Sequence, residues 1–92
     1  MELTNRRVVI TGAGRGIGRA IAIAMGRSGA RLCLWGRTKC NLLETQDLVR
    51  SVGAEVEIIV ADVSIASEVE RAWQVVAGRW GGVDVLVNNA GV

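Results

Sequence analysis

The chain has 92 residues, half of them hydrophobic, which is enough for one small core and therefore for a single domain spanning 1–92. It has no histidine, and its longest apolar run is far too short to span a bilayer, so we expect no metal site and no membrane segment. The net charge of +2 is unevenly distributed: residues 1–46 have eight Lys or Arg against two Asp or Glu, and the second half of the chain is acidic. A basic half could indicate a nucleic-acid partner, but the chain has only three aromatic residues, which argues against one.

The first predicted element is a short strand, Val8–Thr11, apolar enough to be buried on both faces of a parallel sheet. It runs directly into a glycine-rich segment, Gly12–Gly18. Glycine has no Cβ, so the backbone here can turn sharply, approach a pyrophosphate closely and let the following helix pack tightly on its strand. The spacing is neither Gly-x-Gly-x-x-Gly nor that of a P-loop, and an ordinary strand-to-helix turn is the alternative. The amphipathic segment that follows favours a phosphate-binding turn at a helix amino end.

A helix, a strand and a second helix are predicted next. The first helix should end near Gly29, and apolar residues at a helical spacing give it one buried face, made of Ile17, Ala20, Ile21, Ala24 and Met25. The strand is Arg31–Trp35. The second helix should follow the possible N-cap Thr38, and the residues that it should bury are Leu42, Leu43, Val49 and Val52. Without a Cys-x-x-Cys spacing, Cys33 and Cys40 are expected to be free thiols in a reducing, cytoplasmic compartment.

The remaining elements are a strand, a helix and a last short strand. The third strand, Val56–Ala61, is followed by Asp62, and Ser64 is expected to cap the third helix. That helix should end at Gly81, and its apolar residues at helical spacing are Val69, Ala72, Trp73, Val76 and Trp80. The fourth strand is Val83–Val87. The alternation predicts an α/β fold with a parallel sheet, and we expect an incomplete domain whose open sheet edge is available for association with another chain.

Two motifs together point to a known family. Thr-Gly-x-x-x-Gly-x-Gly begins at Thr11 after the first strand, and Asn-Asn-Ala-Gly begins at Asn88 after the fourth. With both in place, the chain resembles the N-terminal half of the short-chain dehydrogenase/reductase family. The resemblance implies a Rossmann-like, doubly wound parallel sheet, here truncated to four strands and three helices, and a nicotinamide dinucleotide cofactor. The cofactor-binding residues that it implies are Gly12, Ala13, Gly14, Arg15, Gly16, Ile17, Gly18, Arg37, Asp62, Val63, Asn89, Ala90 and Gly91.

The resemblance also implies roles for the polar residues that follow the strands. The Asp62 carboxylate would accept a hydrogen bond from the adenine amino group, with Val63 packed beside that ring. The alternative is that Asp62 helps to cap the turn at Ser64. Asn88 would brace neighbouring strands. The residues expected to line the ribose side of the cofactor are Asn89, Ala90 and Gly91.

The end of the second strand bears on the choice between NAD and NADP. NAD-dependent members of the family place a carboxylate there to hold the ribose hydroxyls, whereas this chain has Gly36 at that position. Arg37 is available to bind a 2′-phosphate, and Arg15 in the glycine-rich turn adds a second positive charge. The resemblance therefore implies NADP in preference to NAD; the alternative is that both arginines are solvent-facing charges.

The residues that perform catalysis in the family have no counterpart in this sequence. Family members use a Tyr-x-x-x-Lys pair and a serine, whereas this chain has no tyrosine, and its one lysine, Lys39, lies at the start of the second helix. We therefore expect an NADP(H)-binding segment, inactive alone, of an oxidoreductase that interconverts a carbonyl and a primary or secondary alcohol by hydride transfer. The alternative function is a truncated, non-catalytic module that binds a nucleotide or a partner chain.

Overall fold

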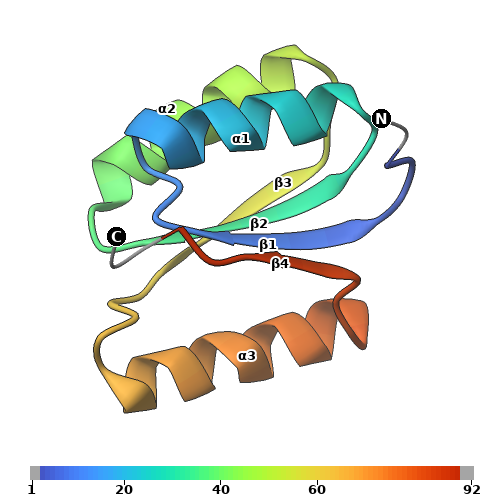
Figure 1. The fold of residues 1–92 in the computed structure, drawn as a ribbon. Helices are drawn as coiled ribbons and strands as arrows, with labels where there is room; N and C mark the ends of the chain where they lie inside the picture. Colours follow the sequence, from blue (N-terminus) through green and yellow to red (C-terminus); the bar gives the residue numbers. More distant parts are fainter. Residues whose placement is uncertain (1–2, 90–92) are drawn as a thin grey trace.

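Four strands alternate with three helices in the computed structural model, which describes residues 3–89. The strands are β1 (Arg7–Thr11), β2 (Arg31–Gly36), β3 (Val56–Val60) and β4 (Val85–Val87), and the helices are α1 (Gly16–Arg27), α2 (Lys39–Ser51) and α3 (Ala66–Trp80). The sheet is parallel throughout, in the order β3-β2-β1-β4. Helices α1 and α2 cover one face and α3 covers the other (Figure 1). The predicted α/β order and parallel, Rossmann-like sheet are confirmed.

The core occupies both faces of the sheet, because side chains alternate along each strand. Val8 and Ile10 of β1 pack with α1 and α2, and Val9 between them packs with α3. All three side chains are completely buried. The residues of β2 that follow the same alternation in register are Leu32 and Leu34 on the first face and Cys33 and Trp35 on the second. Strands that are apolar on both faces are what a parallel sheet between two helical layers requires.

The buried face of α1 differs from the predicted one. The fully buried positions are Gly18, Ala22 and Gly26, whereas Ile17 is 72% exposed. Of the other residues that the prediction placed inside, Ala20 and Ala24 are exposed, and Ile21 and Met25 are half-buried against the core. The reason is close packing: a Cβ added at Gly26 would lie 3.1 Å from Val49 Cγ1 of α2. Small residues, not the most apolar ones, make the contact face of this helix.

The buried face of α2 is partly polar. Leu42 and Val49 are buried as predicted, but Leu43 is 41% exposed, and Val52 at the end of the helix is half-buried. The positions between the two buried apolar residues are taken by Thr45 and Gln46. The Gln46 side-chain amide donates a hydrogen bond of 3.1 Å to the carbonyl of Val56, on the outer edge of β3. A buried polar group needs such a partner, so the burial of Gln46 depends on its contact with β3, outside the helix.

The start of α3 also departs from the prediction, and its end agrees with it. The N-cap residue is Ile65. Ser64 does not cap the helix, because both its backbone N–H and its hydroxyl donate to the Asp62 carboxylate. The helix ends at Gly81, which has a φ of 73° and donates its N–H to the carbonyl of Ala77. Such a left-handed residue after the last turn is the usual glycine position at a helix end.

An ion pair joins the amino ends of β1 and β4. Arg7 Nε lies 3.1 Å from Asp84 Oδ2, and the Arg7 backbone N–H donates to the same oxygen at 2.9 Å. The guanidinium also donates to the carbonyl of Trp80 at 2.9 Å. Hydrogen bonds from the Arg7 side chain and backbone lower the pKa of Asp84 to about 2. Asp84 is therefore a structural charge that joins the amino ends of β1 and β4.

Candidate functional site

The predicted site residues meet at the carboxyl ends of the strands. There, one hollow of about 450 Å³ adjoins a smaller one of about 210 Å³. The larger is lined by Gly12, Arg15, Gly16, Gly36, Arg37, Ala61, Asp62, Val63, Ser64 and Asn89. The smaller is lined by Gly12, Gly14, Arg15, Gly36, Arg37, Thr38 and Asn41. In the sheet, β1 has β2 on one side and β4 on the other, so the strand order reverses at β1. The hollows therefore lie at the topological switch point, where open α/β sheets bind ligands.

Three glycines of the loop after β1 are required for three different geometrical reasons. Gly12 and Gly16 have φ values of 63° and 61°, in the left-handed region that side chains disfavour. Gly18 lies where α1 crosses the loop, and a Cβ there would stand 2.1 Å from the Gly12 carbonyl oxygen. The loop shape that the sequence predicts is therefore present. Ala13 is completely buried, and its N–H donates to the carbonyl of Trp35 at 3.2 Å.

The amino end of α1 is open to an anion. Its N-cap residue is Arg15, whose backbone is extended and whose side chain does not cap the helix with a hydrogen bond. The first turn of the helix has no acidic residue. The first N–H groups of a helix have no partner within the helix, and the helix dipole makes this end positive. The exposed Ile17 lies in this first turn. An oxyanion placed here would meet the first N–H groups of the helix and no acidic side chain from its first turn.

Two arginines flank the hollows. Arg15 and Arg37 line both of them, and within residues 3–89 neither forms an ion pair or a side-chain hydrogen bond. Arg37 follows Gly36 at the end of β2. A Cβ at Gly36 would lie 3.1 Å from Leu42 Cδ2, so a carboxylate could occupy this position only if Leu42 moved. The resulting surface is basic, with its charges available to a bound anion.

Asp62 has the turn-capping role that the sequence gave as the alternative, and it also lines the larger hollow. Its Oδ1 accepts hydrogen bonds from the Ser64 hydroxyl at 2.6 Å and from the Ser64 N–H at 2.9 Å, which is the turn-capping alternative. Yet Asp62 and Val63 also line the larger hollow. The Ser64 hydrogen bonds lower the pKa of Asp62, and the positive charge of Arg37 lowers it further. The side chain is thus an ionised acceptor at the rim of the hollow.

A contact missed from the sequence supports this turn. Glu68 Oε1 accepts a hydrogen bond of 2.9 Å from the backbone N–H of Asp62. Glu68 lies in the first turn of α3, where an acidic side chain faces the positive end of the helix and can reach back to the preceding turn. The position of Glu68 in that first turn is the sequence feature that could have predicted this contact.

The asparagines after β4 tie the end of this strand to the end of β1. Asn89 Nδ2 donates to the Gly12 carbonyl at 3.2 Å, and its backbone N–H donates to Thr11 Oγ1 at 3.0 Å. Thr11 Oγ1 also lies 3.2 Å from Asn88 Oδ1. Asn88 thus joins β4 to β1 through the Thr11 side chain, and Asn89, which lines the larger hollow, joins the same strands. Ala90 and Gly91 lie outside the described residues.

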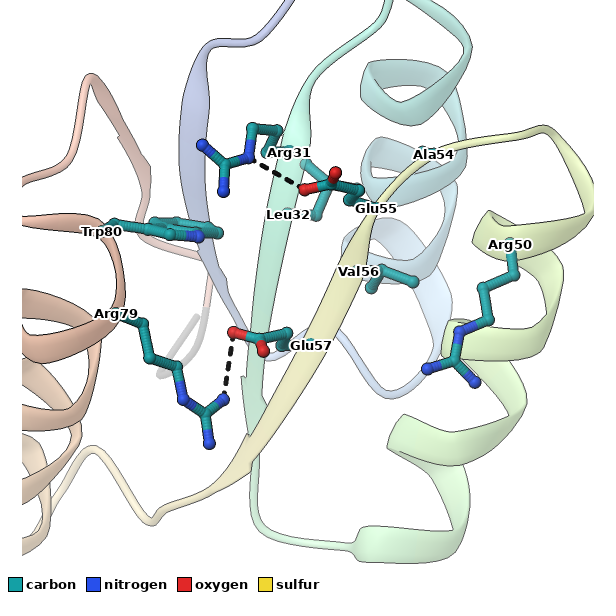
Figure 2. A pocket seen from close by; sticks show the side chains of 9 residues that line it. All are labelled: Arg31, Leu32, Arg50, Ala54, Glu55, Val56, Glu57, Arg79 and Trp80. Atoms are coloured by element: carbon teal, nitrogen blue, oxygen red, sulfur yellow. Dashed lines mark hydrogen bonds and ion pairs between the residues drawn. The ribbon is translucent and has the colours of Figure 1, made fainter.

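Another hollow, of about 520 Å³, is at the opposite end of the sheet (Figure 2). Two of its arginines are paired, Arg31 with Glu55 at 2.9 Å and Arg79 with Glu57 at 3.0 Å. The Arg31 guanidinium also lies 5.7 Å from the centre of the Trp80 ring. This hollow adjoins the last turns of α2 and α3, where helix dipoles repel anions. It is a poor place for a phosphate.

Residues 3–89 contain no candidate metal centre and no candidate membrane span. No group of three or more His, Cys, Asp or Glu side chains is placed to hold a metal ion there. None of the described helices combines the length and the apolar character needed to cross a membrane. Both cysteines are unpaired: Cys40 is exposed, and Cys33 is buried. Burial raises the pKa of Cys33 to about 11, while the neighbouring Trp35 opposes this shift.

Comparison with known proteins identifies the family. The family model described as short chain dehydrogenase matches residues 6–92. The chain is 41% identical over 92 residues to human Short-chain dehydrogenase/reductase 3, covering 99% of this chain and 30% of that protein. It is 40% identical over 90 residues to mouse 17-beta-hydroxysteroid dehydrogenase 13, with 98% and 30% covered.

Solved structures agree with the sequence relatives. Levodione reductase superposes with a TM-score of 0.95 at 38% identity, covering 99% of this chain and 36% of that one. NADH-dependent reductase A1-R′, solved in complex with NAD, gives a TM-score of 0.89 at 33% identity, covering 98% and 38%. The chain spans about 30% of the length of the curated relatives it matches. With the glycine-rich loop, the parallel sheet and the family match in agreement, the chain belongs to the short-chain dehydrogenase family and corresponds to the N-terminal part of its members.

Proposed function

We propose that the chain is the NADP(H)-binding segment of an oxidoreductase that interconverts a carbonyl and a primary or secondary alcohol. When bound, the dinucleotide supplies or accepts the hydride. The observation that carries the choice of NADP is that Arg15 and Arg37, which form no ion pair within residues 3–89, line a hollow where β2 ends in Gly36 instead of a carboxylate. The dehydrogenase and reductase names of the relatives support the reaction class.

The residues present fit a dinucleotide of this kind. The open amino end of α1 and the amides of the glycine-rich loop suit the pyrophosphate, because both present N–H groups without a competing acidic side chain. Arg37 and Arg15 suit the additional 2′-phosphate, which needs charge-assisted donors. Asp62 and Val63 at the rim of the larger hollow suit the adenine, one as an acceptor and one as an apolar surface.

The proton-transfer groups of the reaction are a separate part of the proposal. The chain has no tyrosine and no histidine, and its one lysine, Lys39, is the first residue of α2 beside the 2′-phosphate end of the site. An alkoxide that develops during carbonyl reduction needs a proton donor. We therefore propose that these 92 residues bind the cofactor weakly and do not complete the reaction alone.

A titration of the purified chain with NADPH and NADH tests the proposal. We expect a lower dissociation constant for NADPH than for NADH, and we expect Arg37→Met to raise the NADPH constant about tenfold, since a charge-assisted hydrogen bond contributes roughly 1.5 kcal/mol. NADH binding should be unchanged. The matched control is Arg27→Met, because Arg27 is exposed in the last turn of α1, at the other end of the helix. Equal affinity for both dinucleotides, or equal effects of the two substitutions, would refute the choice of NADP.

A further inference from the structure

A buried hydroxyl in the middle of α2 contacts the glycine-rich loop. Thr45 is completely buried, and its Oγ1 donates to the Ala13 carbonyl at 2.9 Å. The same oxygen lies 3.2 Å from the carbonyl oxygens of Gly14 and Asn41. It accepts a hydrogen bond of 2.9 Å from Nε of Arg19. A threonine on the buried face of a helix is thus fully engaged, and its main partner is the loop.

Arg19 of α1 approaches the same carbonyls from the other side. Its Nη2 donates to the carbonyl of Gly14 and, at 3.2 Å, to that of Asn41. Nη2 also lies 3.2 Å from Glu44 Oε2, but the Glu44 side chain is 65% exposed, so this ion pair contributes little. The Arg19 side chain is three-quarters buried, and its guanidinium bridges the loop, α1 and α2.

These contacts determine which way two loop amides face. In a trans peptide the C=O and the following N–H point in opposite directions. Because the Ala13 and Gly14 carbonyls are held against α2, the N–H groups of Gly14 and Arg15 turn to the other side of the chain. Gly14 and Arg15 both line the smaller hollow. The loop is also pressed against α2, since a Cβ at Gly14 would lie 3.0 Å from Asn41 Cβ.

We propose that Arg19 and Thr45 are positioning residues of the dinucleotide site, which clamp the loop carbonyls to α2 and so present the loop amides to the phosphates. This inference rests on the proposed function. The clamp also connects the two parts of the site, because the N-cap residue Thr38 and Asn41 of α2 line the smaller hollow and Thr45 of the same helix contacts the loop. Neither clamp residue lines the hollows.

Paired substitutions of Thr45 separate clamping from packing. Thr45→Val keeps the shape and removes the hydroxyl, and Thr45→Ser removes a methyl group and keeps the hydroxyl. We expect Thr45→Val to raise the NADPH dissociation constant about tenfold, as the loss of one directed hydrogen bond implies. Thr45→Ser should bind NADPH within about twofold of the unsubstituted chain, although it loses core packing and thermal stability. A merely structural threonine would give the opposite order.

The amide resonances of Gly14 and Arg15 in ¹H–¹⁵N spectra of the NADPH-free chain give a second readout. They should move in Thr45→Val and stay in place in Thr45→Ser. Arg19→Lys keeps the positive charge but lacks the planar guanidinium, so it should move the Gly14 and Arg15 resonances as well. If Thr45→Val fails to fold, the result for Arg19→Lys tests the inference instead. If the unsubstituted chain binds neither NADPH nor NADH, the proposed function fails. The Gly14 and Arg15 resonances then test by themselves whether Arg19 and Thr45 position the loop. Unmoved Gly14 and Arg15 resonances in Thr45→Val and Arg19→Lys would overturn the inference.

Discussion

Replacing Gly18 with alanine probes the contact on which the loop after β1 depends. Alanine is favoured over glycine in a helix by about 1 kcal/mol, so propensity alone predicts a more stable protein. The new Cβ would, however, stand 2.1 Å from the Gly12 carbonyl oxygen and 2.8 Å from its carbon. Ordinary contacts between such atoms are about 3.5 Å, so the loop backbone would have to shift by more than about 1 Å.

The magnitude follows from weighing the two effects. Overpacking against atoms that cannot rotate away costs about 3 kcal/mol, the upper part of the usual range. With the gain in helix propensity subtracted, we expect Gly18→Ala to destabilise the chain by about 2 kcal/mol. Gly78 in α3 is the matched control, because a Cβ there meets nothing within 4 Å. Gly78→Ala should stabilise the chain by about 1 kcal/mol.

Thermal unfolding followed by circular dichroism measures the difference. About 3 kcal/mol between the two variants corresponds to roughly 12–24 °C in melting temperature for a domain of this size. Gly26→Ala should fall between them, since its Cβ would meet Val49 Cγ1 at 3.1 Å and Ala54 Cβ at 3.2 Å, which are side-chain atoms that can yield. A Gly18→Ala melting temperature equal to or above that of the unsubstituted chain would refute the packing argument.

Two further predictions concern charges and thiols. Asp84 has a pKa of about 2 in the folded chain against an ordinary value of 3.8, so its contribution to stability is present above pH 3.8 and is lost as the pH falls through about 2. Asp84→Asn should therefore lower the melting temperature at pH 7 and converge with the unsubstituted chain near pH 2; a constant difference across this range would contradict the assignment. Ellman's reagent at pH 8 should modify the exposed Cys40 in the native chain and Cys33 only after unfolding, since Cys33 is 2% exposed and its pKa is raised to about 11. Reaction of both thiols at one rate would be inconsistent with a buried Cys33.

The sequence predicted those features that depend on local patterns. The glycine spacing after β1 predicted the turn, because positive φ at Gly12 and Gly16 is a property of the segment itself. The alternation of elements predicted the parallel sheet for a similar reason: a crossover helix between adjacent strands leaves few other topologies. Gly81 predicted the end of α3 from its own conformational freedom.

The errors in α1 and α2 occurred where packing between distant elements decides. The contact face of α1 consists of small residues, because α2 approaches closely at Gly26, and an apolar pattern favours Ile17 instead. Thr45 is buried because its hydroxyl donates to the Ala13 carbonyl in a loop far away in sequence. The periodicity of apolar residues in α2 does not predict this contact. Both of these features depend on a partner that only the folded chain supplies. The Ser64 error is local: Ser64 does not cap α3, since the Asp62 carboxylate two residues away already engages it, as the alternative stated from the sequence had it.

The central claim is that a dinucleotide phosphate binds at the loop after β1, with Arg37 at the additional phosphate. The most direct measurement is a map of amide resonance changes in the ¹H–¹⁵N spectrum of the chain during titration with NADPH. We predict that the largest changes fall on Gly14, Arg15, Gly16 and Arg37, around the two hollows at the carboxyl ends of the strands. Changes centred on Arg31, Arg79 and Trp80, in the hollow at the opposite end of the sheet, would contradict it.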